Sequence, residues 1–387
     1  MAFFVSGIAN LIRIEKPWGF GYAWGMDASP TILCCGGGTL GPVTPLVAVA
    51  RRILTVYPDA RIVWAGTPDG PERAVVEANG WPFEAVPVAK LPRYPSIEWI
   101  RWPWRYVRAA VAARGIVARH RPSLVVGVGG YMQVPVMRAA AKVGIPCVLH
   151  QLDAEPGLAN RLVARMCRSV TTSFPYAEPP FGMGVAWTQV PTPSRFAGSS
   201  LPAREEACRR LGLDPSRPVV FVTGGGTGAV GLNRLVVAAK DRIVRVSQVL
   251  HLVGRGKQEA GEDGRAYHPV EFFDEAQMHD GYAAADVVVC RGGVGTLSEL
   301  AGFAKSAIVV PLPGSHQERN VDALVDAVMR VDQDAEHAAE LLAAEIAELL
   351  DDPICRAEMG ERLRAAIPVD DGSALAQRWM EAAGARR

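Results

Sequence analysis

Short, fully apolar runs alternate with longer stretches of helical periodicity along most of the chain. Apolar runs without polar alternation predict strands buried on both faces, and apolar residues three or four positions apart predict amphipathic helices. In the first half the predicted strands are residues 31–35, 60–67, 83–88, 123–131, 145–152 and 169–174, and the predicted helices are 44–57, 72–80, 134–144 and 158–167. This alternation predicts right-handed βαβ units, which form a parallel sheet with helices on both faces.

The same order of elements begins again in the second half of the chain. The strands predicted there are residues 218–222, 248–254, 286–290 and 307–313, with a long helix over 232–246 and a largely helical C-terminal part. A glycine-rich loop follows the first strand of each half, GGGTLG from Gly36 and GGGTG from Gly224. The repeat predicts an α/β protein with two Rossmann-like domains whose parallel sheets face each other across a cleft.

The length of the chain supports the same division, because 387 residues are too many for one hydrophobic core. Residues 190–205 contain three prolines and a Gly-Ser-Ser without apolar periodicity, which is typical of a linker. The predicted parts are an N-terminal extension over 1–28, a first domain over 29–190, a linker over 191–205, a second domain over 206–367 and a C-terminal helix over 368–387 that returns to the first domain.

Composition and charge are typical of a soluble globular protein in a reducing compartment. The chain is 49% hydrophobic and 21% charged, as soluble globular proteins are, and its formal net charge of +1 gives no overall signal for nucleic acid. Its seven cysteines include no C-x-x-C pair, which predicts a reduced, cytosolic protein without a zinc site. In residues 1–28 the positive charges follow the apolar part, so we expect an extension from an upstream start, with Met26 as the natural beginning, rather than a secretory signal or a surface anchor.

The stretch from Ala285 to Gly302 carries the clearest chemical signal. Its apolar run leads through glycines into a helix that starts near Thr296, which leaves unpaired N–H groups at the carboxyl end of a buried strand. Anions bind at such helix N-termini. Glu299 lies one turn into the helix and would repel a phosphate, so we expect its carboxylate to accept hydrogen bonds from a sugar diol. The alternative is that Glu299 only complements the helix dipole.

Other nucleotide and sugar motifs are less specific. The loop GGGTLG matches the dinucleotide pattern G-x-G-x-x-G, but the nearest acid after the second strand, Asp69, lies too far along for the usual ribose contact, which disfavours an NAD enzyme. We interpret Asp332 and Asp334 as helix caps and solvated charges rather than metal ligands. The segment LPGSHQERN offers hydroxyl-binding groups beside Glu299, although capping chemistry alone also explains it.

Taken in order, these motifs resemble the MurG family, the N-acetylglucosaminyltransferases that convert lipid I to lipid II in peptidoglycan synthesis. The motifs that carry the resemblance are GGGTLGPVTPL, GVGGYMQVP, HQLDAEPGLANR, TPSR, TGGGTGAVGLN, VEFFDE, RGGVGTLSE and HQERN, which cover nearly the whole chain from Thr31 on. Each motif is weak alone, but the ordered set is specific. The resemblance implies a GT-B fold, with the donor nucleotide mainly in the second domain.

The resemblance also implies a role for each site residue. Glu299 would bind the ribose of UDP, the backbone at Phe273 the uracil, Arg195 and Gly225-Gly226 the diphosphate, and Gln317 and Asn320 the N-acetylglucosamine. Further donor-site residues are Thr39, Leu40, Gly41, Thr296, Leu297, Ser298 and His316. Gly129, Gly130 and Tyr131 would lie near the acceptor diphosphate.

The chain departs from the family pattern at three of these places. Pro42 stands where the family has a histidine, Asp153 where it has asparagine, and Gly226 where it has serine. With the histidine absent, Asp153 at the end of the strand over 145–152 is the candidate general base. The alternative is that Asp153 only binds a sugar hydroxyl or caps the following helix, which would leave the base, if there is one, to Glu155, His150 or a water molecule.

An arginine-rich aromatic segment spans residues 91–121 and contains a single acid, Glu98. Tryptophans and arginines interleaved in this way favour docking on an anionic membrane surface over nucleic acid or a plain basic helix face. The residues expected at the membrane are Trp99, Arg101, Trp102, Trp104, Arg105 and Arg108.

The expected reaction is inverting transfer of N-acetylglucosamine from UDP-N-acetylglucosamine to a polyprenyl-diphosphate-linked muramoyl-pentapeptide, without metal or cofactor. We expect the protein to be cytoplasmic and peripheral on the inner face of the cell membrane, and we expect no nucleic-acid partner. The alternatives are another lipid or natural-product glycosyltransferase of the same fold, a UDP-N-acetylglucosamine epimerase, or a binding module without enzymatic activity.

Overall fold

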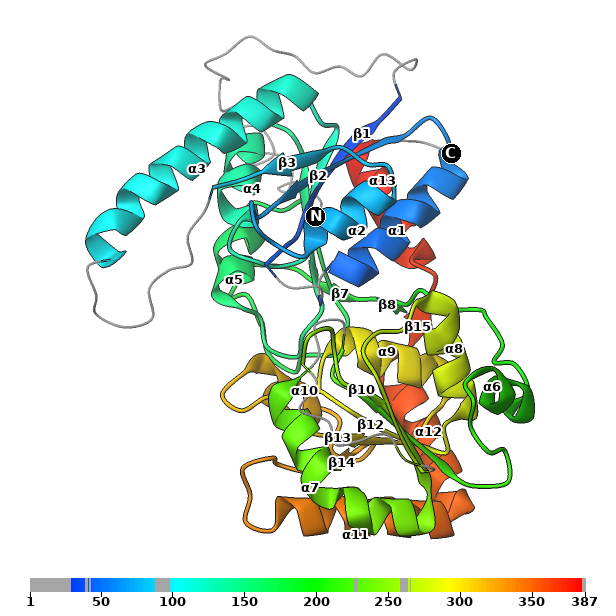
Figure 1. The fold of residues 1–387 in the computed structure, drawn as a ribbon. Helices are drawn as coiled ribbons and strands as arrows, with labels where there is room; N and C mark the ends of the chain where they lie inside the picture. Colours follow the sequence, from blue (N-terminus) through cyan, green and yellow to red (C-terminus); the bar gives the residue numbers. More distant parts are fainter. Residues whose placement is uncertain are drawn as a thin grey trace, which may run out of the picture.

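The computed structural model describes residues 29–38, 41, 43–87, 98–225, 229–257, 264 and 266–384. Within these residues the chain forms two α/β domains, each built on a parallel sheet (Figure 1). This arrangement confirms the prediction of two Rossmann-like domains with the GT-B architecture.

The sheet of the first domain has the strand order β3-β2-β1-β4-β5-β6-β7 in the described part of the chain. Its strands are β1 Thr31–Cys35, β2 Arg61–Gly66, β3 Phe83–Ala85, β4 Leu124–Gly127, β5 Cys147–Gln151, β6 Ser169–Thr172 and β7 Thr188–Gln189. The helices are α1 Val43–Val56, α2 Glu72–Ala78, α3 Glu98–His120, α4 Gln133–Lys142 and α5 Leu158–Ala164. Two apolar clusters sandwich this sheet, as the fully apolar strands predict.

The sheet of the second domain has the order β11-β10-β9-β12-β13-β14 among the described residues. Its strands are β9 Val219–Thr223, β10 Gln248–Leu252, β11 Tyr267–Val270, β12 Val287–Cys290, β13 Ala307–Val309 and β14 Met329–Arg330. The helices are α7 Val230–Val246, α8 Glu275–Ala284, α9 Val294–Phe303, α10 His316–Asp322, α11 Ala338–Asp351 and α12 Pro353–Ala366.

Two chain crossings connect the domains. On the way out, β8 (Thr192–Pro193) pairs in parallel with β15 (Val369–Asp370), which lies on the way back. The last helix, α13 (Ser373–Ala383), then packs against α1, and its Leu375 and Trp379 belong to a core cluster of the first domain (Figure 1).

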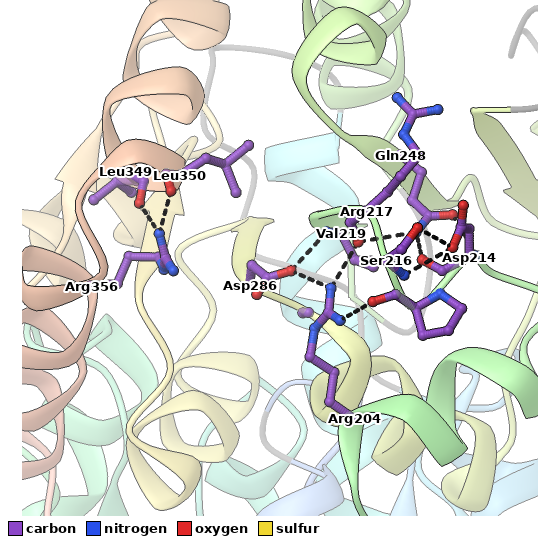
Figure 2. A network of polar contacts seen from close by, with 12 residues as sticks. Arg204, Asp214, Ser216, Arg217, Val219, Gln248, Asp286, Leu349, Leu350 and Arg356 are labelled. Atoms are coloured by element: carbon purple, nitrogen blue, oxygen red, sulfur yellow. Dashed lines mark hydrogen bonds and ion pairs between the residues drawn. The ribbon is translucent and has the colours of Figure 1, made fainter.

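Helix α6 (Arg204–Arg210) is hydrogen-bonded to the second sheet near the amino ends of its strands (Figure 2). The guanidinium of Arg204 donates to Asp286 Oδ2 at 2.8 Å and to the carbonyls of Pro215 and Arg217. The same Asp286 oxygen accepts the backbone N–H of Val219, the first residue of β9, at 2.8 Å. One carboxylate therefore ties the linker helix to the central strand of the sheet.

Replacing Asp286 with alanine should destabilise the second domain by about 2 kcal/mol, because it leaves a partly buried arginine and a strand N–H without their acceptor. The urea midpoint of unfolding measures the effect. Arg242→Ala is the matched control, because its ion pair with Glu340 is half exposed on both sides and should contribute less than about 1 kcal/mol. Equal effects of the two substitutions would show that the Asp286 network does not stabilise the domain.

Candidate functional site at the domain interface

The two domains meet where the loop that follows β5 contacts helix α10, which follows β13. The backbone N–H of Ala154 donates to Asn320 Oδ1 at 2.8 Å, and Asn320 Nδ2 donates to Asp153 Oδ1 at 3.0 Å and to the carbonyl of Gly292 at 2.9 Å. His316 Nε2 lies 3.8 Å from the same Asp153 oxygen. The structure therefore brings together Asp153, His316 and Asn320, which come from opposite domains.

A groove of about 510 Å³ opens beside this contact, between residues 155–161 of the first domain and 314–319 of the second. Glu155 lies 3.5 Å from the guanidinium of Arg161 and 3.7 Å from that of Arg319, and all three side chains are at least half exposed. Ion pairs this exposed contribute little to stability, so a ligand can displace them at small cost.

Glu299 lies in α9, and its side chain is 8% exposed. Its Oε1 accepts a hydrogen bond from Arg195 Nε at 2.8 Å, and its Oε2 accepts one from the hydroxyl of Tyr282 at 2.6 Å. Burial and the adjacent Glu299 carboxylate raise the pKa of Tyr282 well above its ordinary value, so the phenol stays a donor. The carboxylate is held on one side by a buried phenol and on the other by a partly exposed arginine.

The other residues expected at the donor site differ in how far their side chains are accessible to a ligand. The side chain of Leu297 is fully buried in the core, and its N–H donates to the carbonyl of Gly293. Ser298 is also buried, and its hydroxyl donates to the carbonyl of Gly295. Thr296 keeps partial exposure at the start of α9. The ring of Phe273 packs in the core against Phe221, so only the backbone of Phe273 could contact a nucleobase.

Gln317 lies at the start of α10, and its side chain forms a hydrogen bond with the turn before the helix. Its Oε1 accepts the N–H of Leu312 at 3.0 Å, and its own N–H donates to Ser315 Oγ. Asn320 is fully buried by its contacts with the first domain.

The glycine-rich loops are only partly described. Thr39, Leu40, Pro42 and Gly226 lie outside the described residues. Gly41 is exposed in a turn, and Gly225 has a φ of +77°.

Gly129 and Gly130 have φ values of +129° and +89°, in the region that favours glycine. A Cβ on Gly130 would stand 2.8 Å from the carbonyl oxygen of Gly37. The loop that carries the expected acceptor residues therefore touches the first glycine-rich loop, and the partly buried Tyr131 lies beside both.

Two features of this site were not among the residues expected from the sequence. Glu72 is fully buried, and its carboxylate accepts the N–H and hydroxyl of Thr67, both at 2.6 Å, and the N–H of Gly38 at 3.2 Å. Asp69 is the nearest acid after the second strand, but the acid that holds the first glycine-rich loop is Glu72, three residues later. Its position at the start of α2 could have indicated it.

The second feature is a chain of buried amides below the acceptor loop. The N–H of Gly129 donates to Gln133, Gln133 donates to Asn160, Asn160 donates to Gln151, and Gln151 donates to the carbonyl of Asp153. This chain fixes the Gly129 loop relative to the Asp153 loop.

His150 is excluded as a general base by its surroundings. The ring is buried, and its two nitrogens form hydrogen bonds with the hydroxyls of Thr171 and Ser173. Burial lowers its pKa to about 3. The acids of the loop after β5 are Asp153, whose side chain is 34% exposed, and Glu155, whose side chain is 54% exposed.

Comparison with known proteins places both halves of the chain in one family. The N-terminal domain of glycosyltransferase family 28 matches residues 32–172, and its C-terminal domain matches residues 219–369. The UDP-N-acetylglucosamine–N-acetylmuramyl-(pentapeptide) pyrophosphoryl-undecaprenol N-acetylglucosamine transferase of a Nocardioides species is 37% identical, over 90% of this chain and 97% of that protein. The transferase of the same name from Clavibacter sepedonicus is 38% identical, over 88% and 93%.

Solved structures agree at the level of the fold. The crystal structure of Acinetobacter baumannii MurG matches with a TM-score of 0.70 and 21% identity, over 91% of this chain and 99% of that one. A putative UDP-N-acetylglucosamine 2-epimerase from Listeria monocytogenes also matches, with a TM-score of 0.62 and 13% identity, over 91% and 95%. At these identities the two structures share the fold, and the fold alone does not separate transferase from epimerase.

Proposed function

The chain belongs to the family of UDP-N-acetylglucosamine–N-acetylmuramyl-(pentapeptide) pyrophosphoryl-undecaprenol N-acetylglucosamine transferases, and on this premise we propose that it transfers N-acetylglucosamine from UDP-N-acetylglucosamine to a lipid-linked muramoyl-pentapeptide. The observation that carries the proposal is the 37% identity over nine tenths of the chain, including both domains of glycosyltransferase family 28. The enzyme is a hexosyltransferase. The transfer goes to the 4-hydroxyl of the muramoyl sugar and inverts the anomeric carbon.

The nucleotide occupies the second domain, with its ribose hydroxyls on Glu299. In the described structure Arg195 neutralises this carboxylate at 2.8 Å. Arg195 is the more exposed partner, at 25% of its side chain, so the ribose hydroxyls take its place and the guanidinium turns to the diphosphate. The N–H groups at the start of α9 and the loop around Gly225 add to the charge stabilisation as UDP leaves.

The transferred sugar lies where the domains meet. Asn320, Gln317 and His316 line this place from the second domain. The present hydrogen bonds of Asn320 and Gln317 to protein groups are of the kind that sugar hydroxyls replace. The acceptor diphosphate lies on the loop of Gly129 and Gly130, which the amide chain holds against the Asp153 loop. In this arrangement the muramoyl hydroxyl approaches from the first domain and the donor from the second.

Offering a panel of UDP-sugars with and without the polyprenyl-diphosphate acceptor tests the function. UDP released from UDP-N-acetylglucosamine only when acceptor is present, together with the disaccharide lipid, is the expected result. A changed sugar without acceptor would identify an epimerase instead, and release with unrelated lipid or natural-product acceptors would identify another glycosyltransferase of this fold.

Asp153 has two possible roles at this interface: it takes the proton of the acceptor hydroxyl, or it only positions the donor through Asn320. Asp153→Asn separates them, because it keeps the shape and most hydrogen bonds but removes the basic carboxylate. A base predicts a fall in turnover of about 10²- to 10⁴-fold with UDP affinity retained. Near-normal turnover in the folded variant would exclude Asp153 as the base.

Helix α3 provides the surface for the membrane. Figure 1 shows it along the outer side of the first domain, and its Ala109, Ala113 and Ile116 are buried against that domain. On its exposed side Trp104, Val107 and Val111 are 75%, 53% and 61% exposed. These residues are three and four positions apart and form an apolar stripe, which three exposed arginines flank: Arg101, Arg105 and Arg108.

Tryptophan and arginine side chains at an exposed apolar stripe suit the interface of an anionic membrane. We therefore place α3 on the inner face of the cytoplasmic membrane. Trp102 contributes indirectly, since it stacks on Tyr106 at 5.4 Å, and the side chain of Trp99 lies outside the described residues. No helix among the described residues is both long and apolar enough to cross a bilayer.

Replacing Arg101, Arg105 and Arg108 with glutamate should weaken binding to anionic liposomes strongly, since each basic residue contributes about 1 kcal/mol at such a surface. Turnover of a short, water-soluble acceptor should change little. The same charge reversal at Arg209, Arg245 and Arg362, which are exposed on the second domain, is the control and should leave liposome binding near the wild-type value. Equal loss of turnover with lipid and soluble acceptors would instead make α3 a structural element.

A further inference from the structure

Tyr282 is a buried residue that none of the proposed contacts with substrate explains. It lies in α8 and is fully buried, with its ring edge-on to Phe221 at 5.6 Å and to Phe196 at 6.1 Å between centroids. Its hydroxyl donates to Glu299 Oε2 at 2.6 Å. Packing on the ring therefore fixes the position of the hydroxyl, and the hydroxyl fixes one oxygen of the carboxylate.

The two partners of Glu299 differ in what they can do when a ligand arrives. Arg195 lies at the partly exposed side, and its guanidinium also rests over the ring of Phe196 at 4.7 Å, a contact that solvent or ligand can rearrange. Tyr282 has no exposed surface and no room to turn away. Exchange of Arg195 for a ribose therefore leaves Tyr282 as the protein group that still orients the carboxylate.

We propose that Tyr282 is a positioning residue that aims the Glu299 carboxylate at the 2′- and 3′-hydroxyls of the donor ribose, and so contributes to the preference for ribonucleotides over deoxyribonucleotides. The inference rests on the proposed donor site at Glu299. A carboxylate oxygen has two lone pairs. The phenol occupies one lone pair of Oε2 from the interior, which leaves the outward lone pairs of both oxygens for the two hydroxyls.

The phenol also holds the buried carboxylate in one orientation. A hydrogen bond to a charged group contributes more than one between neutral groups, and its loss leaves a buried oxygen without a partner. The carboxylate would then rotate toward the nearest donor, away from the ribose. The loss of affinity should appear only with ligands that have ribose hydroxyls, because in the proposed site the diphosphate and the nucleobase do not contact Tyr282 or Glu299.

The test measures the affinities of UDP and 2′,3′-dideoxy-UDP by calorimetry for the wild type and Tyr282→Phe. The expected result is about a tenfold loss of UDP affinity, close to the lower limit for one charged hydrogen bond, with dideoxy-UDP affinity unchanged. The readout is the ratio of the two affinities, which does not depend on the fraction of folded protein. Tyr282→Met, which also lacks the hydroxyl, repeats the measurement should the phenylalanine variant unfold.

Tyr267→Phe is the matched control. Tyr267 is 3% exposed in the same domain, and its hydroxyl forms a buried hydrogen bond with His251 at 2.7 Å, so the substitution removes the same group from a similar environment. It should leave the affinity ratio unchanged. In a Glu299→Ala background, which should itself bind both nucleotides alike, Tyr282→Phe should have no further effect on the ratio.

Three results would overturn the proposal in different ways. An equal loss with UDP and dideoxy-UDP in Tyr282→Phe would make Tyr282 a purely structural residue. Unchanged affinities for both nucleotides in that variant would show that Glu299 needs no orientation by Tyr282. If the wild type bound both nucleotides alike, the ribose contact of Glu299 itself would fail, whereas the transfer assay would still decide the function.

Discussion

A parallel sheet must end all of its strands at one edge, and the loops of this protein that approach the other domain follow such ends. Asp153 follows β5 in the first domain, and Asn320 follows β13 in the second. Their hydrogen bond joins a loop to helix α10, 167 residues away in sequence. The contacts of Asn320 with Asp153 and Ala154 depend on this arrangement, because their partners come from different domains.

Sequence patterns indicate those features of the candidate site that lie within a few consecutive residues. The glycines before α9 and the position of Glu299 one turn into that helix are visible within a few residues, and the repeated glycine-rich loops gave the two domains. Tyr282 lies seventeen residues before Glu299 on another helix, so only packing reveals their contact. The same holds for Glu72 and Gln133, whose partners come from neighbouring loops, and for Leu297, whose burial depends on how α9 rests on the sheet.

The charges of the site are arranged so that few groups lack a partner before the substrate arrives. Arg195 neutralises Glu299 in the described structure, and Asn320 satisfies one oxygen of Asp153. A buried carboxylate without such a partner would be costly. Under the proposed function, binding of the donor exchanges one set of hydrogen bonds for another, and its net free energy is smaller than a list of new contacts suggests.

The position of α13 has a consequence for how the protein is made. Leu375 and Trp379 fill the core beneath α1, so the first domain encloses residues that the ribosome adds after the whole second domain. Chains grow from the N-terminus, and domains commonly fold as they emerge. Here the first domain must wait with part of its apolar face uncovered while the second domain is synthesised. The order of translation and the order of completed folding are therefore reversed for the two halves of the enzyme, because α13 completes the core that was begun first.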